Sequence, residues 1–260
     1  MTRFESVWLK LDRAKQHIDD LEAAIIAFHR TDPYPIVTED DPQTGRRVVK
    51  VKGKPKPIPS AIPLILGDAV HAIRTSLDHF AYAAVRNPPD PTKVMFPIWS
   101  RDTVPPPEVL KSTIKGNLPG VSEQLRQAIY ALQPYRGGNG EYLWVINRLD
   151  VIDKHRVLLV IDTYPTRFQF DVSGLFAGMD VPYDVPPIVW GIKTQEPAIE
   201  DGAILYDADP NDFQKTKDLQ FTFEIAFDEP KILKREPVVP TLRGLLDEVE
   251  GLLQRLITLV

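Results

Sequence analysis

Cysteine is absent from this chain of 260 residues. Its absence excludes a disulfide scaffold, a thiolate zinc site and a cysteine nucleophile, and it is typical of a protein kept in a reducing cytoplasm. No run of eighteen apolar residues is present, so the sequence predicts no membrane-spanning helix. The first ten residues, MTRFESVWLK, lack the apolar stretch of a secretory signal peptide. We therefore expect a cytoplasmic protein with no membrane partner.

Several motifs of common enzyme sites are also missing. The chain has neither GxxxxGK nor GxGxxG, the glycine-rich phosphate loops, and it has no GxSxG serine elbow. The glycine-rich run RGGNG at 136–140 lacks the lysine and the preceding strand of a phosphate loop. HExxH is absent as well, so we expect no cofactor and no metal. A metal enzyme remains an alternative, because nitrogen and oxygen ligands could come from His71, Asp78, His79, Asp153 and His155.

Long amphipathic stretches are present, separated by connectors that use many of the 25 prolines. Apolar residues at three- and four-residue spacings predict helices at 3–29, 60–86, 105–115, 121–132 and 141–156. Two β-branched runs joined by TEDDPQTG predict a hairpin at about residues 34–52. Residues 1–156 are therefore expected to be mainly helical, with one hairpin.

The pattern changes at residue 157. Residues 157–230 contain short strand-like runs, of which LQFTFEIAF alternates polar and apolar side chains most clearly. Residues 240–259 return to helical periodicity, with leucines and a valine along one stripe, and residues 231–260 are assigned to a C-terminal helix. We expect a single domain over residues 1–260 of the α+β class. It would have a helical-bundle core, an antiparallel β-sheet insertion at 157–230 and a C-terminal helix at 231–260 that packs back on the N-terminal helix.

Charge is distributed unevenly around a net value of −5. Residues 157–230 contain 14 acidic and 4 basic side chains, whereas residues 1–156 contain 18 acidic and 22 basic ones. The densest basic run, RRVVKVKGKPK at 46–56, has six positive residues and no acid. This run is either a solvated hairpin arm or an arm that contacts phosphates, and it lacks aromatic residues that would stack on bases.

Two helical segments carry more polar groups than a buried helix needs. In residues 66–80 and just beyond, the helical period places a polar series on one face: Gly67, His71, Arg74, Asp78 and Tyr82. His79 lies about 140° away from Arg74 around the helix axis. In residues 147–159, polar groups crowd the point where helix gives way to strand: Asp150, Asp153, Lys154, His155 and Arg156.

Both segments have a structural interpretation. Arg74 and Asp78 can form an ordinary ion pair four residues apart, and His71 can be a half-buried histidine with a hydrogen-bond partner. Lys154, His155 and Arg156 would complement the dipole at the end of a helix. The functional interpretation instead uses both segments as one site, in which imidazole moves protons and arginine holds an anion.

The run RTSLDH at 74–79 places four residues between Arg74 and His79, and in this it resembles the HEPN superfamily of helical proteins. Many members are metal-independent ribonucleases of toxin–antitoxin and phage-defence systems, and others bind nucleotides without cleaving them. Arg148 and His155 repeat the pattern with six intervening residues. Residues 66–159 also resemble a set of uncharacterised bacterial proteins, which brings no activity with it.

The resemblance implies roles for individual residues. His79 would act as general base or acid on an RNA 2′-hydroxyl or leaving oxygen, and Arg74 would stabilise charge on the phosphorus. Asp78 and His155 would complete the catalytic set. Ligand contacts would come from His71, Asp153, Lys154 and Arg156. The expected partners are RNA or another phosphate-bearing ligand and a second copy of the chain, because sites of this type form at a dimer interface.

A non-catalytic module that binds an anion or a partner protein is the main alternative. It would use the same arginine and histidine groups together with aromatic residues such as Trp99, Tyr135 and Trp144. A concave pocket formed by Phe96, Trp99 and Tyr135 near Arg74 would favour a small ligand. Polar groups that meet across a two-fold axis would favour the nuclease.

Overall fold

The computed structural model describes residues 2–88, 90–155, 159, 161–171, 188–191, 199–208, 217–229 and 231–260. Within these residues the chain forms helices and two sheets, so the predicted α+β class is confirmed. Two compact units are present. The first consists of Met1–Ala24, Ser60–Val160 and Phe227–Val260, and the second consists of Ile25–Pro59 and Ile161–Ala226.

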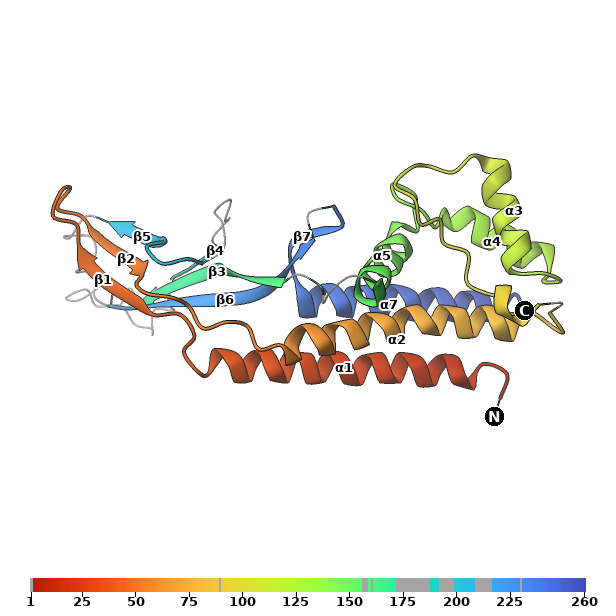
Figure 1. Ribbon diagram of the computed structural model, residues 1–260, viewed down its shortest axis with the longest axis horizontal. Helices are drawn as coiled ribbons and strands as arrows, with labels where there is room; N and C mark the ends of the chain where they lie inside the picture. The colour runs from red at the N-terminus through yellow and green to blue at the C-terminus, as the bar shows by residue number, and fades with distance from the viewer. Residues whose placement is uncertain are drawn as a thin grey trace, which may run out of the picture. The chain divides into compact units, whose positions relative to one another are not determined.

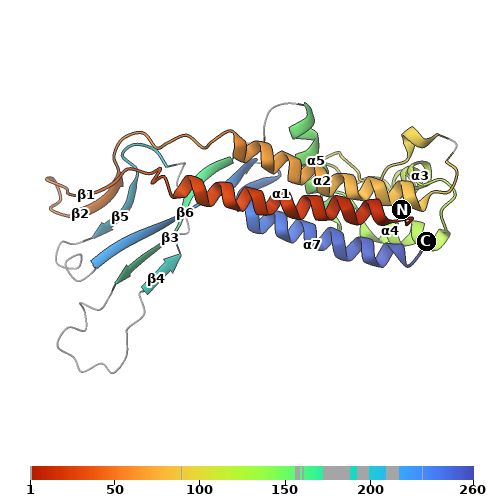
Figure 2. The same ribbon diagram turned by 90° about the horizontal axis from the view of Figure 1, so that it is seen from below.

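Three long helices form the core of the first unit. They are α1 (Glu5–His29), α2 (Ala61–Ala84) and α7 (Val238–Ile257), which run side by side in both views (Figures 1 and 2). The apolar stripe of each helix is buried, as shown by Leu11 and Ile18 on α1 and by Leu246 on α7. Ion pairs join α1 to α7, with Lys15 Nζ 2.9 Å from Glu250 Oε2 and Arg243 Nη2 2.7 Å from Glu22 Oε2. The C-terminal helix therefore packs on the N-terminal helix, as predicted.

Three shorter helices complete this unit. α3 (Pro107–Asn117) and α4 (Glu123–Leu132) form a helical hairpin, seen at the upper right of Figure 1. Ser122 begins α4 because its hydroxyl accepts a hydrogen bond from Leu125 N at 3.1 Å. α5 (Glu141–His155) packs on α2 and α7 and carries the buried Trp144 and Leu149. A 3₁₀ turn, η1 (Pro91–Lys93), follows α2.

The strands form two sheets, and the predicted hairpin and the segment 157–230 both contribute to the first of them. The predicted hairpin is present as β1 (Ile36–Asp40) and β2 (Arg47–Val51), and β2 also pairs antiparallel with β5 (Ile204–Ala208). The other sheet has the order β4-β3-β6-β7. Its strands are β3 (Ile161–Asp171), β4 (Ile188–Gly191), β6 (Lys217–Glu229) and β7 (Leu233–Pro237).

Strand β7 corrects one boundary of the sequence analysis, which assigned residues 231–260 to the C-terminal helix. Leu233–Pro237 is a strand with alternating exposure, and the helix begins only at Val238. Pro237 lacks an amide hydrogen and holds an extended backbone with ψ of 130° directly before α7. Pro240 lies in the first turn of the helix, where its missing N–H has no cost.

Aromatic rings surround His29 at the end of α1 in the second unit. Its ring centroid lies 5.8 Å from that of Phe28 and 6.1 Å from that of Tyr34. Tyr34 also packs on Phe223 at 4.2 Å and shares a hydrogen bond with Thr163. His29 Nε2 is buried and has no hydrogen-bond partner among the described residues. Burial lowers the pKa of His29, so the folded chain favours the neutral ring.

We expect the second unit to lose stability as the pH falls from 7 to 5. Since the pKa of His29 is lowered by folding, its contribution is complete above the unfolded value of about 6.5 and is lost as the pH falls below it. The measurement is the urea midpoint of wild type and His29→Phe at each pH. The variant should lose less stability than wild type, whereas His155→Gln, which removes an exposed histidine, should follow wild type. Equal losses in wild type and His29→Phe would contradict this assignment.

Candidate functional site

Polar side chains line the seam where α2 packs on α5. Three contacts follow each other along it: Gly67 with Asp153, His71 with Asp150, and Arg74 with Asn147. As the residue number rises along α2 it falls along α5, so the two helices pass each other in opposite directions. The seam therefore unites parts of the two segments that the sequence analysis singled out.

His71 and Asp150 form the middle contact of this seam. Asp150 is buried, and its Oδ1 lies 2.9 Å from His71 Nδ1 while its Oδ2 accepts a hydrogen bond from Lys154 Nζ at 2.7 Å. An ionised carboxylate can only accept, so Nδ1 carries the proton and Nε2 of a neutral His71 is an acceptor. Nε2 lies 3.3 Å from Thr75 Oγ1 on an exposed part of α2. The carboxylate thus fixes the orientation and the tautomer of the His71 ring.

Arg74 lies deeper in the seam, with 7% of its surface exposed. Its Nε donates a hydrogen bond to Asn147 Oδ1 at 3.0 Å, and its Nη1 forms a 2.6 Å ion pair with Asp78 Oδ1. The same Asp78 oxygen accepts a hydrogen bond from Phe96 N at 2.9 Å. Arg74 thus connects α2, α5 and the loop that contains Phe96, and an anion that binds Nη1 would compete with Asp78.

His79 lies in an open groove of about 470 Å³ that does not include Arg74. The lining residues are Ser6, Thr75, Asp78, His79, Tyr82, Ala83 and Val94. Burial lowers the pKa of His79, and the positive charge of Lys10 adds to this, while Asp78 opposes it. His79 is consequently a neutral proton acceptor at pH 7. Arg74 and His79, the two residues that define the RTSLDH motif, lie on different sides of α2. Asp78 forms an ion pair with Arg74 and also lines the groove of His79.

The remaining predicted residues lie at the end of α5. Asp153 packs against Gly67, and burial together with the charges of Asp150 and Asp68 raises its pKa. Lys154 is bound to Asp150, as described above, so it belongs to the seam. His155 is exposed and is the last residue of the helix. Arg156 lies outside the described residues.

Asn147 and Asp150 are functional candidates that the sequence analysis did not assign. Their signal is the helical spacing of Asn147, Asp150 and Lys154, which places three polar side chains on one face of α5. That face could be recognised from the sequence, but the helix that it packs against could not.

The aromatic residues expected to mark a ligand pocket make contacts of other kinds. Phe96 is buried in the core beside Phe80, with ring centroids 6.2 Å apart. Trp99 donates a hydrogen bond to Thr103 O at 2.8 Å and lies under the guanidinium of Arg101. Trp144 is buried, with Arg136 over its ring. These contacts give no support to an aromatic pocket around Arg74.

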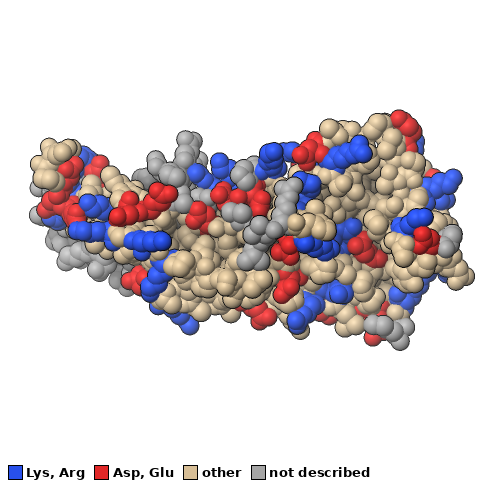
Figure 3. All heavy atoms as spheres, in the orientation of Figure 1, with Lys and Arg blue, Asp and Glu red and all other residues tan. Residues whose placement is uncertain are grey.

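Acidic neighbours neutralise much of the basic run at 46–56. Arg46 Nε lies 2.6 Å from Asp207 Oδ1 on β5, and Arg47 Nε lies 2.6 Å from Asp40 Oδ1. Glu39 pairs with both Lys50 and Lys52. Figure 3 shows blue and red side chains intermixed over this hairpin on the face in view. The hairpin therefore has the character of a charge-paired arm, which explains why a basic segment and an acidic one occur in the same sheet.

Neither the metal alternative nor a membrane span finds a counterpart in the described part of the chain. There, no three His, Asp or Glu side chains converge as a metal would require, and no helix is both long and apolar enough to cross a bilayer. No family model, no curated protein and no solved structure matches this chain.

Proposed function

We propose that the protein is a HEPN-like, metal-independent ribonuclease whose reaction takes place on the exposed face of α2. The observation that carries this proposal is the position of His79, a neutral histidine in an open groove that it shares with Asp78, the counter-ion of Arg74. Asp78 therefore lies between the two groups, because it lines the groove of His79 and forms the ion pair with Arg74. The resemblance implies a homodimer, and the cysteine-free sequence suggests that the protein acts in the cytoplasm.

The reaction needs a base, a charge that stabilises the transition state, and a scissile phosphate. His79 would take the proton of a ribose 2′-hydroxyl while O2′ attacks the adjacent phosphorus. The bond from phosphorus to O5′ then breaks, O5′ takes a proton from water, and a 2′,3′-cyclic phosphate is left. The phosphate would replace Asp78 as the partner of Arg74, so that the guanidinium stabilises the charge that develops on phosphorus.

Cleavage of end-labelled RNA in EDTA tests this proposal. Wild type should cleave, and His79→Ala should slow cleavage by roughly 10²- to 10⁴-fold because it removes the base. His71→Ala reports whether the His71–Asp150 pair contributes, and His155→Ala reports on the end of α5. His17→Ala is the matched control, since His17 lies on α1 and does not line the groove, and it should cleave like wild type.

A second function is favoured by the burial of Arg74. Arg74 already has an ion pair with Asp78 and a hydrogen bond with Asn147, so its role in the seam can be purely structural. The protein would then be a non-catalytic module that binds an anion or a partner. Absence of cleavage by wild type would favour this second function. Cleavage that persists in His79→Ala and disappears only in His155→Ala would instead move the chemistry to α5.

A further inference from the structure

The cleft between α3 and α4 is a site that neither the sequence analysis nor the proposed ribonuclease uses. It has a volume of about 390 Å³, which is within the range of small-molecule pockets. We propose that this cleft binds a small phosphate-bearing ligand with a ring system, of the class of a nucleoside monophosphate. The proposal is independent of the chemistry at His79.

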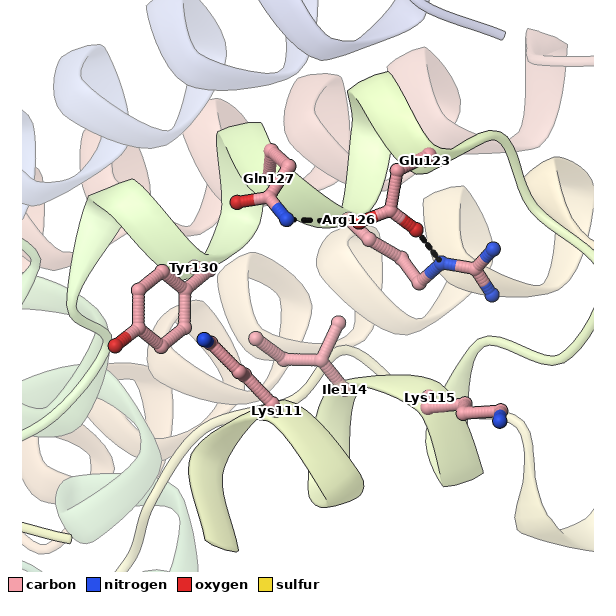
Figure 4. A pocket seen from close by; sticks show the side chains of 7 residues that line it. All are labelled: Lys111, Ile114, Lys115, Glu123, Arg126, Gln127 and Tyr130. Atoms are coloured by element: carbon pink, nitrogen blue, oxygen red, sulfur yellow. Dashed lines mark hydrogen bonds and ion pairs between the residues drawn. The ribbon is translucent and has the colours of Figure 1, made fainter. Parts of the chain in front are cut away.

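The residues that line the cleft form one row on α3 and one row on α4, because their spacing matches the helical period. On α3, Lys111 and Lys115 are four residues apart and flank Ile114, whose buried side chain forms the floor. On α4, spacings of three, four and seven residues from the first position give a second polar row: Glu123, Arg126, Gln127 and Tyr130. Figure 4 shows the two rows facing each other across the cleft.

Positive charge exceeds negative charge in this cleft. Lys111, Lys115 and Arg126 face a single carboxylate, that of Glu123. Glu123 accepts hydrogen bonds from Arg126 Nε at 3.0 Å and from Gln127 Nε2 at 2.7 Å. These bonds lower the pKa of Glu123 and keep it ionised. Only Nε of Arg126 is used by Glu123, so the two terminal nitrogens of the guanidinium can bind a phosphate with the geometry that arginine provides.

The two ends of the cleft differ in chemistry. Lys115 and the guanidinium of Arg126 lie at one end, and Tyr130 lies at the other with Lys111 5.1 Å from its ring centroid (Figure 4). A phosphate fits the first end, and a sugar or flat ring fits beside the partly exposed ring of Tyr130. On the face seen in Figure 3, basic side chains are intermixed with acidic ones. The three cations of the cleft surround a volume of about 390 Å³, which suits a small ligand better than a long RNA.

Calorimetric titration of the full chain with AMP at low salt tests this proposal. AMP should bind, inorganic phosphate should bind more weakly, and adenosine should give no measurable heat, because the cations recognise the phosphate. Arg126→Gln and Lys115→Gln should each weaken AMP binding roughly fivefold to tenfold. Both side chains lie at the surface of a hairpin, and circular dichroism at 222 nm verifies that each variant is folded.

Lys93→Gln is the matched control for net charge. It removes one positive charge from an exposed side chain outside the cleft, so AMP should bind this variant as it binds wild type. Equal weakening in all three variants would show a general charge effect and overturn the site. No binding of AMP to wild type, adenosine binding as tightly as AMP, or binding of an oligoribonucleotide without AMP would overturn it as well.

Discussion

Arg74→Ala is expected to destabilise the helical unit by about 3 kcal/mol. The side chain is almost wholly buried and joins Asp78 on its own helix to Asn147 on α5. Its removal leaves an amide and a carboxylate without their partner and opens a space in the seam. Breaking a fully buried ion pair costs about 3–5 kcal/mol, and the lower end applies here because Asp78 is 37% exposed and can be hydrated.

Urea unfolding followed by circular dichroism at 222 nm measures this loss. Arg243→Ala is the control, because Arg243 also joins two helices through carboxylates, those of Asp19 and Glu22, but its side chain is 44% exposed. We expect the control to lose less than a quarter as much stability as Arg74→Ala. A similar loss in both variants would show that the buried contacts of Arg74 contribute no more to the free energy of unfolding than the exposed ion pairs of Arg243.

This result also determines how a loss of activity is interpreted. Arg74→Ala would abolish RNA cleavage whether Arg74 touches a phosphate or only supports the seam. Arg74→Lys keeps the charge but loses the fork that reaches both Asp78 and Asn147. The rate of cleavage per folded molecule, with the folded fraction taken from the unfolding curve, separates a catalytic role from a structural one.

The helical part of the fold could be predicted because its signal is local. Three- and four-residue spacings locate α1, α2 and α7, and one broad apolar stripe on each requires a partner helix. The distribution of strands between sheets was not predictable in the same way. β2 pairs with β5, which lies about 150 residues further along the chain, in a register that places Arg47 opposite Ala208. Alternation within each strand defines its faces but does not identify its neighbour.

Part of the candidate site was predictable from the sequence, but its separation into a covered seam and an open groove was not. The helical period placed Arg74 next to Asp78 and His79 on another side of α2. It could not show that α5 covers Arg74 while the groove at His79 stays open, because that depends on which helices pack against α2. The sequence analysis left Asn147 out and gave Asp150 no role of its own, because their contacts with Arg74 and His71 depend on the packing of α5 against α2.

Gly67→Ala is expected to destabilise the helical unit by about 2 kcal/mol, although alanine is the better helix former by about 1 kcal/mol. A Cβ at Gly67 would lie 2.6 Å from Asp153 Cγ and 2.7 Å from its Oδ2. The methyl group must therefore displace the partly buried carboxylate of Asp153 or separate the two helices.

Gly244→Ala is the matched control, because Gly244 lies within α7 and has no atom within 4 Å of the position that a Cβ would take. It should gain about 0.5–1 kcal/mol from helix propensity alone. Chemical denaturation of Gly67→Ala, Asp153→Ala and the double variant then measures the coupling between the two positions. The double variant should be more stable than Gly67→Ala, because removal of the carboxylate provides room for the methyl group. If Gly67→Ala is instead as stable as Gly244→Ala, the carboxylate of Asp153 does not pack against Gly67 in solution.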